Sequence, residues 1–350
     1  MGRWLRAPIL AVCLMPAGVA AAQDWATPET CRMAPLADPA DALPAADRAV
    51  IEKAAAAIPF GTGRLWRITA PGGQVSHLWG THHSSAPLIL DLPPELKALV
   101  PGAAVLVLEN DPVAASRVQL EERALQAGMW LAPADADYPK DWLSGPLRDW
   151  IAARLKAITF QDGTLPRLTD AGLAELMLGD PCEDFAAGVL PVQDNRLYLA
   201  AHEAGVPVAG LEKESAFLSE MSQPDRRDVA QAIAKVYGAY LDPDGFSQGR
   251  SAVAALYRQG RIGALMASNR AFLDRIFGAD EAGRLAALAD GYLLDERNRT
   301  FLARMRKHLD HGQALIAVGA FHLPGSQGLL ADLQAAGYRV ERVPTSGEAE

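Results

Sequence analysis

The sequence predicts an α/β protein in which N-terminal, central and C-terminal strands form one mixed β-sheet, with a large helical region of about residues 113–310 inserted between them. Two strand-like runs flank a glycine-containing turn within 64–79, and a short continuous apolar run follows at 105–108. The chain closes with a strand, a helix and a strand over 313–343. Strands near both ends with helices between them are typical of a sheet that carries an inserted helical region.

Residues 1–22 are typical of a secretory signal peptide. Arg3 and Arg6 supply the positive charge, an apolar run follows, and Ala20–Ala22 provide the small residues of a cleavage site. The apolar run is shorter than the roughly 20 residues of a membrane-spanning helix. We therefore expect residues 23–350 to form one periplasmic or secreted domain, with an uncleaved anchor as the alternative.

Cleavage would leave two cysteines, Cys31 and Cys182. Disulfides form and persist in oxidising compartments, so we expect these two residues to be bonded. Two free thiols are the alternative, because a sequence cannot show whether the Cα atoms approach within about 7 Å.

The elements expected before residue 112 are a helix, a hairpin, a short helix and a strand, at 45–58, 64–69 with 75–79, 93–100 and 105–108. The two hairpin runs are rich in β-forming residues and are separated by Pro71-Gly72-Gly73, a pattern that predicts two antiparallel strands joined by a turn. The run Val105–Leu108 has no polar residue, as in a strand that is covered on both faces.

The region that follows is rich in alanine and leucine and predicts helices at 113–128, 145–158, 170–178, 192–204, 214–222, 225–240, 247–258, 261–276, 280–290 and 292–310. One strand, 206–212, interrupts it after Gly205, a residue that suits a helix end. The chain then ends with a strand at 313–318, a loop at 319–325, a helix from Ser326 to Ala336 and a strand at 338–343.

Composition and charge exclude some classes of protein. The 350 residues are 50% hydrophobic and 21% charged, which excludes a wholly disordered chain. The formal net charge is −9, and nucleic-acid-binding proteins usually carry a basic patch. We therefore expect no nucleic-acid partner. We also expect no membrane span after signal cleavage, and the oligomeric state stays open.

Three predicted strands end on side chains that commonly bind metals. The first ends at His82-His83, the second at Glu109, and the last shortly before His322. Ligands gather at the carboxyl ends of strands in open α/β sheets, and imidazole with carboxylate suits a divalent metal ion such as Mn, Zn, Co or Fe. The strand 206–212 ends on Glu212 and would bring a further carboxylate to the same edge.

Both histidines follow a glycine at the same spacing, Gly80-x-x-His83 and Gly319-x-x-His322. Such a short motif arises easily by chance, but both copies lie where an apolar run becomes a loop. Glycine there permits a positive φ or a close approach of the backbone to a ligand. A hydrogen-bonded structural imidazole is the alternative for either histidine.

Together these motifs resemble the TraB/GumN family, which includes the Tiki metalloproteases and is similar in site layout to erythromycin esterases and haem-binding ChaN-like proteins. The resemblance spans roughly residues 64–343 and is carried by Leu78–His83, Val107–Glu109, Asp194, Gly205–Glu212, Glu296–Arg299 and Ala314–Gly325.

The resemblance implies a site made of the two motif histidines, a carboxylate, two polar partners and a second acid: His83, His322, Glu109, Arg297, Asn298 and Glu212. His82 departs from the family pattern, which usually has an apolar residue there. Adjacent strand residues point to opposite faces, so His82 is open to three roles: a group behind the site, a surface residue or an extra ligand.

These observations favour an exported metal-dependent hydrolase, with peptidases among the candidates, acting on a peptide or small acyl substrate. A metal-activated water would attack an acyl carbon, with Glu109 as ligand or base and Arg297 steadying negative charge. One alternative is an extracytoplasmic protein that binds haem, iron or another ligand without turnover. A regulatory protein with a decayed site is less favoured, because all three ligand-type residues are present.

Overall fold

The computed structural model describes residues 36, 38–84, 86–110, 128–132, 143, 145–157, 164–179, 192–213, 215–240 and 246–348. The expected signal peptide, Cys31, Cys182 and nearly all of the helix expected at 113–128 lie outside the described residues.

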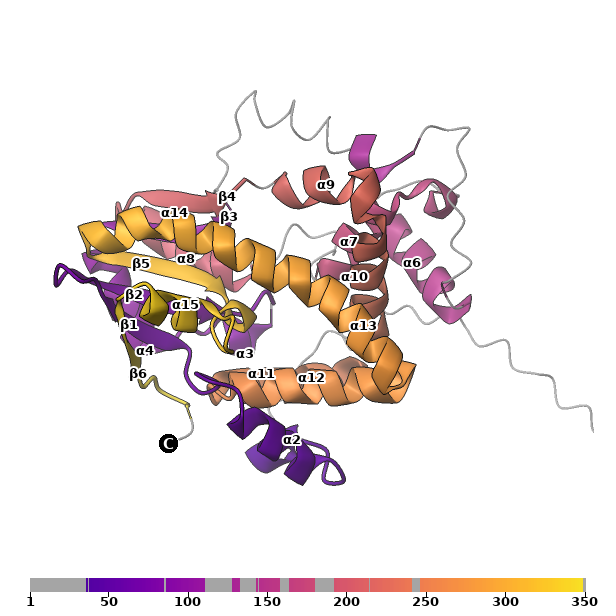
Figure 1. Ribbon diagram of the computed structural model, residues 1–350, viewed down its shortest axis with the longest axis horizontal. Coiled ribbons are helices and arrows are strands. Elements are labelled where there is room, and N and C mark those ends of the chain that lie inside the picture. The colour runs from indigo at the N-terminus through magenta and orange to yellow at the C-terminus, as the bar shows by residue number, and fades with distance from the viewer. Residues whose placement is uncertain are drawn as a thin grey trace, which may run out of the picture.

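Six strands form one mixed sheet, which confirms the expected α/β class (Figure 1). In chain order the strands are β1 Leu65–Thr69, β2 Val75–Thr81, β3 Val105–Asn110, β4 Val208–Glu212, β5 Ala314–Gly319 and β6 Arg339–Val343. Their order in the sheet is β4-β3-β5-β2-β1-β6. β4, β3, β5 and β2 run parallel, and β1 pairs antiparallel with β2 and β6. The expected hairpin is therefore present, and the apolar strands β3 and β5 are direct neighbours.

The described helices are α2 Arg48–Ala56, α3 Pro87–Leu90, α4 Pro94–Leu99, α6 Gly145–Ala157, α7 Asp170–Leu178, α8 Gln193–Glu203, α9 Ala216–Met221, α10 Arg227–Ala239, α11 Phe246–Arg258, α12 Ile262–Phe277, α13 Ala279–Asp290, α14 Arg297–His311 and α15 Leu329–Ala335. Short 3₁₀ turns lie at Pro39–Ala42, Val100–Gly102, Leu165–Arg167, Pro224–Arg226 and Ala320–His322, and a π-helix, η6, spans Gly291–Glu296. None of these helices has the length and apolar character that crossing a membrane requires.

Two expectations about helix ends were wrong. The last helix begins at Leu329 rather than Ser326, because Gly328, directly before it, has an extended backbone with a φ of −79° and a ψ of 157°. Gly291 was expected to separate two helices, but its φ is −55° and the helix continues through it. α13, η6 and α14 therefore form one continuous run that crosses the molecule in Figure 1.

Helices cover both faces of the sheet, which explains why its central strands are apolar throughout. On one face, Phe301 of α14 packs in a cluster with Val107 and Ile316. On the other face, Leu197 of α8 packs in a cluster that includes Leu106. All six residues of β5 are buried, as expected for a strand in the middle of an α/β sheet.

The strand register brings the site together. Thr81 of β2 lies opposite Gly319 of β5, and Asn110 of β3 lies opposite Glu212 of β4. The carboxyl ends of four parallel strands therefore meet at one edge of the sheet. α6, α7, α9 and α10 gather to the right of the sheet in Figure 1 and pack in apolar clusters that also include residues of α12 and α13.

Candidate functional site

Three ligand-type side chains meet at this edge of the sheet. The Nε2 atoms of His83 and His322 lie 3.7 and 3.6 Å from the same oxygen, Oε1 of Glu109. The side chains of Glu109 and His322 are each 5% exposed, whereas that of His83 is 51% exposed. We call these three residues the His–Glu cluster. The structure thus brings together the three residues named from the strand ends, and His83 forms the solvent-facing side.

Gly319, the first residue of the second Gly-x-x-His motif, lies directly beneath the His–Glu cluster. A Cβ atom at this position would stand 3.0 Å from Glu109 Oε1, 3.2 Å from His83 Nε2 and 3.4 Å from His322 Cδ2. The Gly319 N–H also donates a hydrogen bond to Glu109 Oε1. The motif glycine therefore leaves the space between the three side chains open and anchors the carboxylate.

Gly80, the first residue of the other motif, has a packing role. A Cβ atom there would stand 2.9 Å from a Leu323 methyl group and 3.0 Å from the Ala320 Cα. Neither motif glycine has a positive φ. A positive φ, the first of the two roles expected for these glycines, is therefore absent. Gly80 approaches another segment of this chain, and a close approach of Gly319 to a ligand stays a prediction.

Asn298 fixes the proton position on His322. Its amide nitrogen donates to the carbonyl oxygens of Gln327 and His322, so its Oδ1 faces His322 Nδ1 at 2.7 Å. An amide oxygen only accepts, so Nδ1 carries the proton and Nε2 carries the lone pair. Burial lowers the pKa of His322 to about 3, and the charge of Glu109 opposes this shift only in part. The imidazole is therefore neutral near pH 7, with its lone pair directed towards Glu109.

His83 is also held through Nδ1, which lies 2.9 Å from Asp194 Oδ2. Burial lowers the pKa of His83, but Asp194 and then Glu109 act more strongly and raise it well above 6.5. Because half of the side chain is exposed, water limits the burial effect and the two carboxylates dominate. The two motif histidines thus differ: His322 is neutral, and His83 holds a proton more readily than a free imidazole.

Arg297 joins two carboxylates. Its Nη2 donates to Glu109 Oε2 at 2.8 Å, and its Nε donates to Glu212 Oε1 at 2.6 Å. Burial raises the pKa of Glu109, but the charge of Arg297 outweighs it and holds that pKa well below 4.5. For Glu212, burial outweighs Arg297 and raises the pKa. Glu212 contacts Arg297 rather than either imidazole, so among the described contacts it joins the His–Glu cluster only through the guanidinium.

The sequence reasoning did not assign two residues at the start of α8 to the site. Asp194 accepts a hydrogen bond from Thr81 Oγ1 at 3.1 Å in addition to holding His83. Gln193 Oε1 accepts from the Trp79 indole at 3.1 Å and from the His82 N–H at 3.3 Å. Asp194 was visible only as part of the family resemblance, because its partner His83 lies 111 residues away.

His82 takes a different direction from His83. Its ring lies against Tyr257, with ring centroids 5.3 Å apart. The Tyr257 hydroxyl lies 2.7 Å from Gln193 Oε1 and 2.8 Å from the Gly80 carbonyl. Of the three roles open to His82, this placement matches a group behind the site.

The donor types of the His–Glu cluster fit a divalent metal ion. The His322 lone pair and the ionised Glu109 oxygen are both acceptors, and they face each other at 3.6 Å, an arrangement that a cation between them would stabilise. Each imidazole is held through its other nitrogen, as metal-binding histidines are. Within the described part of the chain, however, no three His, Cys, Asp or Glu side chains stand in a ready metal-holding arrangement. Glu109 already accepts from Gly319 and Arg297.

Comparison with known proteins gives one match. The model of the TraB/PrgY/gumN family matches residues 64–342, which include every residue of the site described above. No curated protein and no solved structure matches the chain.

Proposed function

The chain belongs to the TraB/PrgY/gumN family, and from this premise we propose that it is an exported metal-dependent hydrolase that acts on a peptide or small acyl substrate. His83, Glu109 and His322 would hold the metal ion.

One observation carries the proposal. Two imidazole nitrogens face a single carboxylate oxygen at 3.6 and 3.7 Å over a glycine that leaves the space between them open. Zinc sites of this kind combine His and Glu ligands with an open position for water or substrate. The exposed side of His83 is where a substrate would approach.

A divalent metal ion bound there would acidify a bound water and polarise an acyl oxygen. The protein's own contribution is to orient the donors and set their charge. Asn298 keeps the lone pair of His322 on Nε2, and Arg297 keeps Glu109 ionised. The guanidinium is already shared between two carboxylates, so its role here is to position Glu109 rather than to steady negative charge on the substrate.

Elemental analysis of the protein purified from the periplasm or medium tests the proposal. The wild type should carry about one divalent metal per chain. His83→Gln and His322→Gln should lower the metal affinity by more than about 100-fold, since removal of even an outer-shell partner costs about 10- to 100-fold. His311→Gln, at the exposed end of α14, is the matched control and should retain the metal.

A peptide-library cleavage screen with and without chelator completes the test. Cleavage that needs the metal and is lost in both histidine variants supports the hydrolase. Bound metal or haem without cleavage of any peptide or ester would favour the ligand-binding alternative. Absence of metal from wild type and variants alike, after incubation with Mn, Zn, Co and Fe, would refute the metal site.

A further inference from the structure

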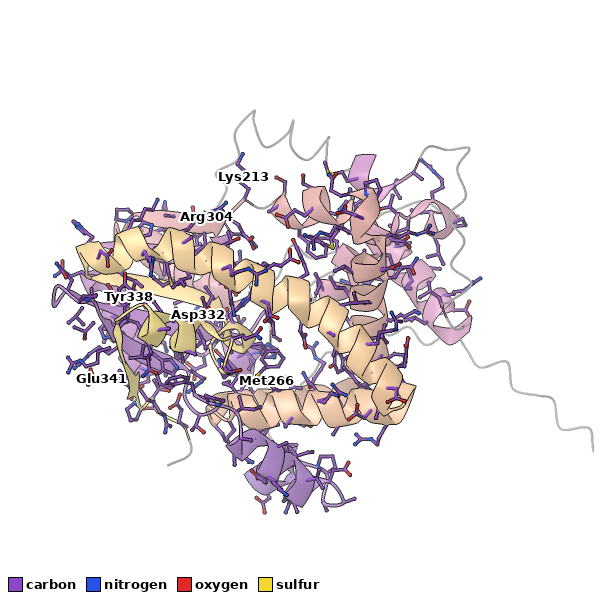
Figure 2. The ribbon with its side chains drawn as sticks, viewed as in Figure 1. Lys213, Met266, Arg304, Asp332, Tyr338 and Glu341 are labelled. Carbon is purple, nitrogen blue, oxygen red and sulfur yellow. The ribbon has the colours of Figure 1, made fainter. Side chains whose placement is uncertain are left out.

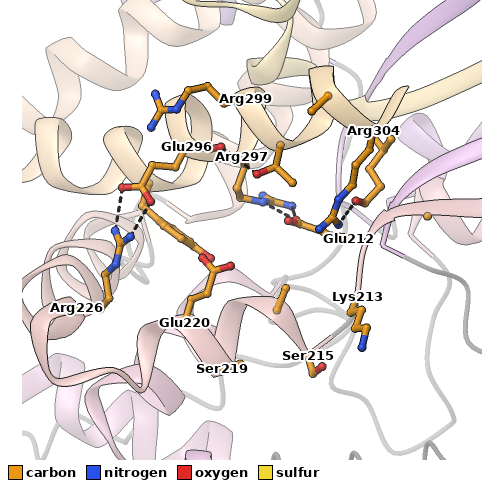
Figure 3. A pocket seen from close by; sticks show the side chains of 16 residues that line it. Glu212, Lys213, Ser215, Ser219, Glu220, Arg226, Glu296, Arg297, Arg299 and Arg304 are labelled. Atoms are coloured by element: carbon orange, nitrogen blue, oxygen red, sulfur yellow. Dashed lines mark hydrogen bonds and ion pairs between the residues drawn. The ribbon is translucent and has the colours of Figure 1, made fainter. Parts of the chain in front are cut away.

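An open pocket of about 1070 Å³ lies beside the His–Glu cluster, between the end of β4, helix α9 and the first turns of α14 (Figure 3). Glu212 and Arg297 line it. Arg297 also binds Glu109, so one guanidinium separates the pocket from the candidate metal site.

The pocket carries an excess of positive charge. Arg226 is neutralised by Glu296 through two hydrogen bonds of 2.8 Å, and Arg297 by its two glutamates. Three further basic residues of the lining form no ion pair with a described carboxylate: Lys213, Arg299 and Arg304. Glu220 is the one acid of the lining that no described basic residue pairs with.

Two of these three basic residues lie at one end of the pocket, and Arg299 lies apart from them (Figure 3). Lys213 and Arg304 lie at the β4 end in Figure 3, and Figure 2 labels the same two side chains above β4 and along α14. Arg304 uses one Nη1–H for the Leu211 carbonyl, so the strand holds the guanidinium in place. Both side chains are exposed.

These two side chains suit a carboxylate. A carboxylate accepts charge-assisted hydrogen bonds from a guanidinium or an ammonium group, and Arg304 and Lys213 offer one donor group of each kind on the same pocket lining.

We propose that the β4 end of this pocket, formed by Lys213 and Arg304, binds a carboxylate group of the substrate, so that the preferred substrates are peptides bearing a carboxylate. The role as a substrate subsite rests on the proposed hydrolase function, whereas carboxylate binding itself does not.

Isothermal titration calorimetry of the full exported chain, with excess chelator and 50 mM NaCl, tests the binding step. The probe is N-acetyl-tetraglutamate amide, with the tetraglutamine amide as its neutral counterpart. We expect the glutamate peptide to bind at least tenfold more tightly, and the difference to shrink at high salt because exposed charges are screened. A third peptide, tetraglutamine with a free C-terminal carboxylate, distinguishes side-chain from terminal carboxylates. Tighter binding of either acidic peptide supports the site.

Two charge-matched double variants locate the binding. The double variant Lys213→Gln with Arg304→Gln should bind the acidic peptide about tenfold or more less tightly, since charge-assisted hydrogen bonds are stronger than neutral ones. Arg306→Gln with Lys307→Gln removes the same charge from the same helix outside the pocket lining and should change little. If loss of the contact between Arg304 and the Leu211 carbonyl impairs folding, the single variant Lys213→Gln is measured instead. The proposal would be overturned if both double variants lost the same affinity for the acidic peptide. It would also be overturned if the wild type bound the neutral peptide as tightly as the acidic one.

Cleavage assays separate this inference from the proposed function. Metal-dependent cleavage with no preference for acidic peptides would refute the subsite and leave the hydrolase intact. Carboxylate binding that depends on Lys213 and Arg304, with no cleavage of any peptide, would refute the hydrolase and leave the binding site intact.

Discussion

Individual residues set the charge and the space of the His–Glu cluster. Asn298 directs the lone pair of the buried, neutral His322 towards Glu109, and Asp194 favours a proton on His83. Gly319 provides the room in which these groups meet. Each of these effects can be removed by one substitution that leaves the core packing unchanged.

Gly319→Ala should impair the site without unfolding the protein. The added methyl group would lie 3.0 Å from Glu109 Oε1 and 3.2 Å from His83 Nε2, so both side chains must shift by a few tenths of an ångström. We expect at least a tenfold loss of metal affinity, measured with a competing chelator. Gly249→Ala, in helix α11 with open space around it, should keep the affinity and raise the free energy of unfolding by about 0.5–1 kcal/mol. Unchanged affinity in Gly319→Ala would contradict the geometry.

Metal affinity should fall with decreasing pH from a point above 6.5. A metal ion needs a deprotonated Nε2, and Asp194 and Glu109 raise the pKa of His83. Below that raised pKa, one proton competes with the metal, so the apparent affinity should drop by about tenfold per pH unit. His322, with a pKa near 3, adds no proton in this range. An affinity that is flat between pH 8 and 6 would show that His83 is not a ligand.

Among the helices and strands, helix α8 holds the end of β2 in place through hydrogen bonds. Gln193 and Asp194 are its first two residues, and they bind the chain at Trp79, Thr81, His82 and His83. The direction of His83 therefore depends on a helix that enters the structure more than 100 residues later.

Asp194→Asn tests this role of α8 as a positioning device. The substitution keeps the shape but removes the charge that raises the pKa of His83. We expect the His83 pKa, followed by NMR in the metal-free protein, to fall, and the metal affinity to drop by about 10- to 100-fold. Glu203→Gln, which removes a charge at the exposed far end of α8, should change neither quantity. A lower affinity with an unchanged His83 pKa would point to a general loss of structure instead.

The long helical run from α13 to α14 is the second positioning element. Its π-helix, η6, ends at Glu296, directly before Arg297 and Asn298. π-helical turns occur frequently at functional sites, and this one precedes the two helical residues that hold Glu109 and His322.

In the molecule as a whole, Glu348 near the C-terminus binds Arg64 beside the sheet, and the Arg64 guanidinium lies over the ring of Tyr257 in helix α11. Glu348, with a side chain 2% exposed, accepts hydrogen bonds from the backbone N–H and Nε of Arg64, and from Arg342 Nη2 at 2.9 Å. The Arg64 guanidinium also lies over the rings of Trp79 and Tyr257 at 5.1 and 5.3 Å. This buried ion pair links residues 284 positions apart.

Glu348→Ala should lower the free energy of unfolding by about 3–5 kcal/mol, because it leaves two arginines near a buried site without their carboxylate. Urea denaturation followed by circular dichroism measures this loss. Glu281→Ala breaks an exposed pair with Arg284 and should change the free energy of unfolding very little, because water screens surface ion pairs. If both substitutions lower the free energy of unfolding by the same small amount, the Arg64–Glu348 pair is solvated rather than buried.

Most of the secondary structure, and three ligand-type residues of the candidate site, can be predicted from the amino-acid order. Unbroken apolar runs such as 105–108 and 314–318 predict central strands, because only a strand covered on both faces tolerates them. Chemistry-bearing residues at the ends of those runs identify His83, Glu109 and His322, because parallel strands end at one edge of the sheet.

How those residues are held and charged follows from contacts that only the folded chain makes. The pairing of His83 with Asp194 and of His322 with Asn298, and the bridge from Glu109 through Arg297 to Glu212, join segments 24 to 188 residues apart. Local periodicity carries no information about such contacts. The opposite pKa shifts of the two motif histidines likewise follow from burial and neighbouring charge, which exist only once the chain has folded. The sequence pattern gives no sign of this difference, since the same Gly-x-x-His spacing occurs at both histidines.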